Sequence, residues 1–120
     1  MSKNKYINMD ITNLPTPVFI VDERLLKRNL EMLKSVIDRT GCKILLAQKG
    51  FSMFYFYPLI GKYLNGTTAS SLFEARLGYE EMELKSKDRK LETHIFNPSY
   101  REDEFDEIMK ITNHIVFNSF

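Results

Sequence analysis

Short apolar runs alternate with amphipathic segments along most of the chain, and this alternation limits the folds open to it. The runs are rich in β-branched residues and about four or five residues long, as is typical of buried strands. They lie at residues 18–21, 43–47, 66–69, 93–96 and 114–117, of which 66–69 is the weakest. Strands separated by helical segments and short connections predict βα units that build a parallel sheet.

The segments between these runs carry apolar residues at helical spacing and have signals for helix ends. Helices are predicted over residues 23–39, 72–82 and 105–112, and residues 53–64 are apolar on nearly every side, which predicts burial. Ser71 with Glu74, and Ser99 with Glu102, match the S-x-x-E capping box. Gly41 lies where the first helix should end.

Composition excludes some classes of protein. The chain has 120 residues, about one small domain, and its net charge is +1, with 17 basic and 16 acidic residues interleaved. This balance does not suggest a nucleic-acid partner. The longest apolar run, residues 51–60, is far shorter than the roughly 20 residues of a membrane span. No signal peptide is evident, and a single cysteine fits a reducing compartment, so we expect a cytoplasmic protein.

Lys49 is the first candidate for chemistry because it follows the apolar run at 43–47. In a (β/α)8 barrel, active sites form at the carboxyl ends of the strands. A lysine partly desolvated there has a lowered pKa, and its amine can attack an aldehyde. Gly50 would let a cofactor approach the backbone closely. Spacing alone favours the simpler interpretation that Lys49 marks the return of the chain to solvent.

Small hydroxyl residues form a second candidate group at the end of the next strand. Thr67 and Ser70 lie in the segment GTTASS, which precedes a predicted helix, and such groups can bind an anion. A capped helix with tight packing explains the same residues, and it is the commoner case. Asn97 and Asn118 end the following two strands in a similar way, although each alone is more often a turn residue.

Other familiar signatures are missing from the sequence. His94 and His114 lie in predicted strands without cysteine or aspartate partners at metal-ligand spacing, so we predict no metal site. There is neither a G-x-G-x-x-G fingerprint nor a P-loop.

Several segments, in order, resemble the carboxynorspermidine decarboxylase family. LLAQKGF at residues 45–51 is similar to the LLALKGF signature of its cofactor lysine, with Gln48 in place of the usual leucine. PTPVFIVDE at 15–23 resembles the opening segment of the family. GTTASSLFEARLG at 66–78 is close to the corresponding family segment along its whole length. FNPSY at 96–100 and HIVFNS at 114–119 are also similar to family segments, whereas the link at 83–92 is longer.

The resemblance implies a fold-type III enzyme that uses pyridoxal 5′-phosphate (PLP), with a (β/α)8 barrel, a second β domain and a homodimeric assembly. It implies that Lys49 is catalytic and bonds to PLP. Thr67 and Ser70, from the second candidate group, are then the candidate further contacts of the cofactor. The implied reaction is decarboxylation of carboxynorspermidine or carboxyspermidine, a polyamine acid, to norspermidine or spermidine.

The expected domain organisation is a flexible lead-in at residues 1–14 and a truncated barrel at 15–120. A whole barrel takes roughly 250 residues, so this chain would reach about the fourth strand. The residues that bind the phosphate and the pyridine nitrogen, and the catalytic cysteine, would lie beyond Phe120, and the chain alone is predicted to be inactive.

Two alternatives remain at this stage. One is a different fold-type III protein, such as an amino-acid racemase or a PLP-binding homeostasis protein, against which the segment at 66–78 argues. The other is a non-catalytic remnant that folds without binding a cofactor.

Overall fold

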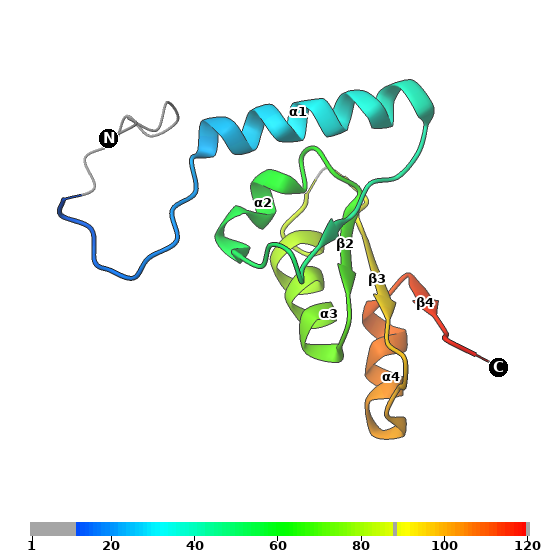
Figure 1. Cartoon of the computed structure of the whole chain (residues 1–120). Helices are drawn as coiled ribbons and strands as arrows, with labels where there is room; N and C mark the ends of the chain where they lie inside the picture. Colours follow the sequence, from blue (N-terminus) through cyan, green and yellow to red (C-terminus); the bar gives the residue numbers. More distant parts are fainter. Residues whose placement is uncertain (1–11, 88, 120) are drawn as a thin grey trace.

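A parallel β-sheet forms the centre of the molecule (Figure 1). The computed structural model describes residues 12–87 and 89–119. Within them the sheet has four strands in the order β1-β2-β3-β4, and each neighbouring pair is parallel. The strands are β1 (Leu46–Ala47), β2 (Gly66–Ala69), β3 (Glu92–Phe96) and β4 (His114–Val116). The predicted α/β class and the parallel succession of strands are thus confirmed.

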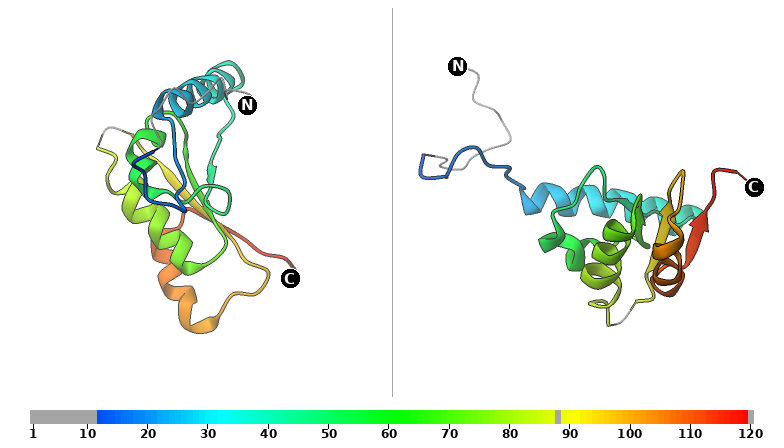
Figure 2. Two further views of the ribbon diagram at one scale, coloured as in Figure 1. Left: turned by 60° about the vertical axis from the view of Figure 1, so that its left-hand side comes forward. Right: turned by 90° about the horizontal axis from the view of Figure 1, so that it is seen from below.

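Helices connect the strands and precede the first of them. They are α1 (Glu23–Thr40), a 3-10 turn (Phe54–Phe56), α2 (Tyr57–Ile60), α3 (Leu72–Gly78), a π-helical turn (Tyr79–Glu83) and α4 (Glu102–Ile111). The three predicted helices correspond to α1, to α3 with its π-helical continuation, and to α4. Figure 2 shows α3 and α4 side by side along the sheet, with α1 lying across the region where the strands begin.

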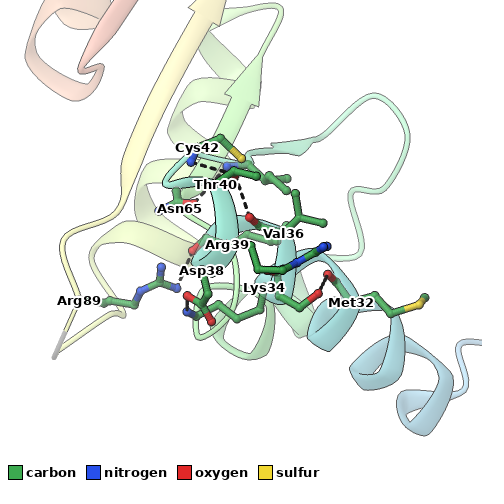
Figure 3. A network of polar contacts seen from close by, with 12 residues as sticks. Met32, Lys34, Val36, Asp38, Arg39, Thr40, Cys42, Asn65 and Arg89 are labelled. Carbon is green, nitrogen blue, oxygen red and sulfur yellow. Dashed lines mark hydrogen bonds and ion pairs between the residues drawn. The ribbon is translucent and has the colours of Figure 1, made fainter.

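Both ends of α1 use the local chemistry that their residues suggest. The Asp22 carboxylate accepts hydrogen bonds from the backbone N–H groups of Arg24 and Leu25. Gly41 ends the helix with a left-handed φ of 71° and donates its N–H to the Ile37 carbonyl. Figure 3 shows the polar contacts around this end, where the chain turns toward β1.

The core consists of two apolar clusters. The first joins α1, α2 and the π-helical turn and contains Leu30, Tyr57, Ile60, Leu64, Met82 and Leu91. The second lies between the sheet and helices α3 and α4 and contains Ala69, Leu72, Ala75, Ile95 and Ile108. Burying this apolar surface supplies most of the driving force for folding.

The two faces of the sheet therefore differ. Side chains alternate along each strand, so partners in register share a face. The register partners Ala69 and Ile95 pack against the helices, whereas the partners His94 and His114 lie on the opposite face, where His114 is exposed. We call this second side the open face.

Three sequence expectations differ from the structure. Residues 18–21 are not a strand, and Phe19 is 93% exposed, because no described segment pairs with this stretch. Ser99 does not cap α4: its N–H donates to Asn97 Oδ1 in a turn, and the helix begins after Arg101. The segment 53–64 is only partly buried, since Phe54 and Tyr55 are exposed.

The link after α3 runs from the helix to the amino end of β3, away from the carboxyl ends of the strands. Arg89 secures it by donating to the carbonyl oxygens of Gly61 and Leu64 (3.0 and 2.7 Å). Of the predicted lead-in, residues 1–11 lie outside the described residues. Across residues 12–87 and 89–119, no helix combines the length and apolar character needed to cross a membrane.

Candidate active site at the carboxyl edge of the sheet

The carboxyl ends of the four strands lie along one edge of the sheet, because all strands run in parallel. Lys49, Ser70, Asn97 and Asn118 each follow a different strand at this edge. The Asn97 side chain stabilises the turn after β3, because its Oδ1 accepts the Ser99 N–H, as expected of a turn residue. Asn118 is exposed. The topology thus gathers the strand-end candidates along one edge.

Lys49 lies in the tight turn that follows β1. The turn is closed by the N–H groups of Gly50 and Phe51, which both donate to the Ala47 carbonyl (3.0 and 3.3 Å). Lys49 is exposed, and its amine forms no hydrogen bond or ion pair with the described residues. The expected desolvation is therefore not provided by these residues. A Cβ at Gly50 would make only an ordinary 3.6 Å contact with the Ala47 carbonyl oxygen, so packing within the described residues does not itself require glycine there.

Gln48, which stands in place of the leucine of the similar family signature, anchors this turn. Its side chain is 2% exposed, and Nε2 donates to the Glu74 carbonyl on α3 (2.8 Å). Its Oε1 accepts the hydroxyl hydrogen of Tyr57 (3.1 Å). Burial, with a smaller effect of the Glu74 charge, raises the pKa of Tyr57 to about 12, so this hydroxyl stays a donor. Gln48 thereby fixes the residue before Lys49 to the helical layer.

Ser70 is half-buried, and its backbone N–H is already engaged in a local hydrogen bond. Its N–H donates to the Glu74 carboxylate (2.8 Å), and Ser71 Oγ accepts from the Glu74 N–H (3.3 Å). The predicted capping contact of Ser71 is confirmed, although the carboxylate bonds to Ser70 rather than to Ser71. Since Glu74 occupies the Ser70 N–H, an anion at this place would have to displace it.

Thr67 lies on the helix-covered face, away from the edge that carries Lys49. It is 1% exposed, and its Oγ1 has no hydrogen-bond partner among the described residues. A Cβ built on Gly78 of α3 would come within 2.1 Å of that oxygen, so Thr67 packs directly against the helix. The structure therefore does not bring Thr67 together with Lys49.

A surface pocket of about 380 Å³ lies elsewhere, beside the link at residues 85–89. Its lining residues include Pro58, Gly61, Lys62, Met82, Lys85 and Arg89. This pocket adjoins the amino end of β3, so we do not assign the chemistry of Lys49 to it.

The arrangement defines a class of protein: a parallel βα chain whose candidate site is the carboxyl edge, with an accessible lysine after the first strand. Comparison with known proteins narrows this class. No family model matches the chain. It is 41% identical over 106 residues to carboxynorspermidine/carboxyspermidine decarboxylase of Campylobacter jejuni, which covers 88% of this chain and 26% of that protein.

Further relatives agree with this match. Carboxyaminopropylagmatine decarboxylase of Synechocystis is 37% identical over 112 residues (93% of this chain, 27% of the relative). Carboxynorspermidine/carboxyspermidine decarboxylase of Herminiimonas arsenicoxydans is 35% identical over 106 residues (88% and 27%). The crystal structure of the Campylobacter jejuni carboxynorspermidine decarboxylase with norspermidine superposes with a TM-score of 0.79 at 40% identity, over 88% of this chain and 27% of that one.

The chain is a homologue of the carboxynorspermidine/carboxyspermidine decarboxylases, and it spans about a quarter of their length.

Proposed function

We propose that these residues form part of a PLP-dependent decarboxylase that removes CO2 from carboxynorspermidine or carboxyspermidine. The observation that carries the proposal is the joint match in sequence and fold, at 40–41% identity and a TM-score of 0.79. The accessible amine of Lys49 at the carboxyl edge supports it independently, because active sites of parallel α/β folds form at this edge.

The described residues fit one part of a PLP site. The Lys49 amine would hold the cofactor by bonding to the aldehyde carbon of PLP. This amine is exposed, and no carboxylate among the described residues pairs with it. Bound PLP supplies an electron-accepting ring for the electrons released when CO2 leaves. Gln48 positions the turn of Lys49 through its contacts to Glu74 and Tyr57. Ser70, at the same edge, is the second candidate contact.

The same proposal covers the architecture of the whole protein. The four parallel strands would be the first part of a (β/α)8 barrel, with residues 15–120 contributing to it and a second domain and a partner subunit completing a homodimer in the cytoplasm. The coverage of 26–27% of the relatives supports only the partial barrel in this proposal, because a full barrel alone takes roughly 250 residues.

A second candidate function has its own support. The Synechocystis relative is named for carboxyaminopropylagmatine, and its match spans 112 residues of this chain. Both names describe a carboxylated amine that loses its carboxyl group, so the two candidates share the reaction and differ in substrate.

A chimera tests both candidates. The stretch of the Campylobacter jejuni enzyme that matches this chain is replaced by this chain's own residues, and CO2 release is measured from carboxynorspermidine, carboxyspermidine and carboxyaminopropylagmatine. We expect turnover with PLP, and the ratio among substrates reports the preference. Lys49→Ala should abolish turnover and the visible absorption of bound PLP, and borohydride should attach PLP covalently to Lys49 in the parent chimera only.

Lys62→Ala is the matched control, because it removes an exposed lysine far from the carboxyl edge. It should keep both turnover and absorption. An active Lys49→Ala chimera, or a peptide mass that places PLP on another lysine, would overturn the assignment of Lys49.

A further inference from the structure

Three potential metal ligands meet on the open face, at the amino end of β3 and β4. Glu92 and His94 are two residues apart on β3, so they share a face, and His94 pairs in register with His114 of β4. The two imidazole rings have centroids 4.3 Å apart. Neither histidine has a partner at the usual sequence spacing, so the strand pairing itself assembles the group.

The spacing of the donor atoms suits a small divalent ion. Glu92 Oε2 lies 2.9 Å from His94 Nε2 and 3.7 Å from His114 Nε2, and one donor atom from each residue lies within 4.8 Å of the others. Tetrahedral zinc with bonds of about 2.0–2.2 Å separates its ligands by about 3.3–3.6 Å. The two distances from Glu92 lie on either side of this range, and all three donor atoms lie within 4.8 Å of one another. Shifts of up to about 1.2 Å in exposed or half-buried side chains would therefore bring the three donors to tetrahedral spacing.

We propose that Glu92, His94 and His114 form a binding site for a divalent transition-metal ion such as Zn²⁺. The ligand set of two imidazoles and one carboxylate is among those that bind zinc and related ions. Within the described residues His114 is exposed, which leaves a fourth position at the ion for water. Lys43 pairs with the other carboxylate oxygen of Glu92 and so orients it as a single-oxygen ligand.

The location separates this site from the candidate active site. Glu92 begins β3 and His114 begins β4, whereas Lys49 follows the carboxyl end of β1. A bound ion would link β3 to β4, which is only three residues long. We therefore assign the ion a structural role, independent of the proposed decarboxylation.

Metal titration of the full chain tests the proposal. The protein is stripped with a chelator, and Zn²⁺ binding is followed by calorimetry, with Co²⁺ as a spectroscopic probe whose visible bands report imidazole ligation. We expect one equivalent of either ion and a rise in the melting temperature on saturation. His114→Ala and Glu92→Gln should each weaken binding at least about tenfold, by loss of one ligand of three.

Glu107→Gln serves as the control, because it removes a carboxylate that pairs with Arg76 on another part of the surface. It should bind as the parent does. Circular dichroism is the check that each variant folds, and the exposed position of His114 makes His114→Ala the decisive variant. Absence of stoichiometric binding, or equal affinity in parent and His114→Ala, would overturn the proposal and leave the cluster as an ion-paired network.

Discussion

At the scale of single residues, two threonines that face each other across β2 and β3 differ in one hydrogen bond. Thr67 and Thr93 are register partners, and both are buried. Thr93 donates to Glu83 Oε2 (3.0 Å), whereas Thr67 Oγ1 has no partner among the described residues. A buried hydroxyl without a partner costs free energy, and one with a partner does not.

Replacing each threonine by valine should therefore have opposite effects. Thr67→Val should leave the free energy of unfolding unchanged or raise it by up to about 1 kcal/mol. Thr93→Val should lower it by about 1–3 kcal/mol, because burial already raises the pKa of Glu83 and the donor that opposes this shift is lost. Urea unfolding measures both. A larger loss in Thr67→Val than in Thr93→Val would contradict this explanation.

Gln48 and Tyr57 offer a second residue-scale prediction. Gln48→Leu leaves the Tyr57 hydroxyl with only the longer contact to the Phe51 carbonyl (3.4 Å) and leaves the Glu74 carbonyl without its side-chain donor. It should cost about 1–3 kcal/mol of stability. The double variant Gln48→Leu/Tyr57→Phe should lose less stability than the sum of the losses in the two single variants, by about 0.5–3 kcal/mol. Strict additivity in thermal unfolding would show that the two side chains are not coupled.

At the scale of elements, two glycines with positive φ show how backbone and space act separately. Gly41, after α1, has a φ of 71°, and apart from its own chain neighbours no atom of the described residues lies within 4 Å of the place that a Cβ would take. Gly66, at the start of β2, has a φ of 141°, and a Cβ there would lie 1.8 Å from the Glu92 carbonyl oxygen on β3. The first position needs glycine for its conformation alone, and the second also for the strand pairing.

Alanine at these positions should therefore differ in its cost. Gly41→Ala should destabilise the chain by about 1–2 kcal/mol, the cost of a left-handed residue with a side chain. Gly66→Ala should cost more than about 3 kcal/mol or prevent folding, because backbone of the neighbouring strand must move. Circular dichroism melts compare the two variants. Equal melting temperatures would contradict the explanation that β3 leaves no room for a side chain at Gly66.

Elements that depend on local sequence signals could be predicted, whereas those that depend on contacts distant in the sequence could not. The span 66–69 and the end of α1 at Gly41 rest on local signals, namely apolar runs and capping, and they match the structure. The strand expected at 18–21 needed a partner, which local pattern does not contain. The face of Thr67 and the role of Gln48 depend on contacts with α3 and Tyr57, which only the packed fold brings near.

At the scale of the whole molecule, the sheet ends at β4, which has a strand neighbour on one side only within the described residues. Val116 of this strand is 51% exposed, and Phe117 beyond it is exposed as well. The Tyr100 hydroxyl donates to the Val116 carbonyl (2.7 Å) and so protects one polar group of the strand. An apolar edge strand with unpaired backbone groups is a template for pairing with another chain.

These 120 residues on their own, without the further barrel strands proposed above, should therefore self-associate at high concentration, and a charge on β4 should oppose this. Val116→Lys should shift sedimentation velocity toward the monomer, because a lysine on an edge strand blocks further pairing. Met109→Lys is the matched control: it makes the same kind of change at a residue that is 57% exposed, but on α4, away from the edge. We expect it to associate as the parent does. If both variants associate equally, the contact between chains does not form through β4, and the helical layer would be the surface to examine next.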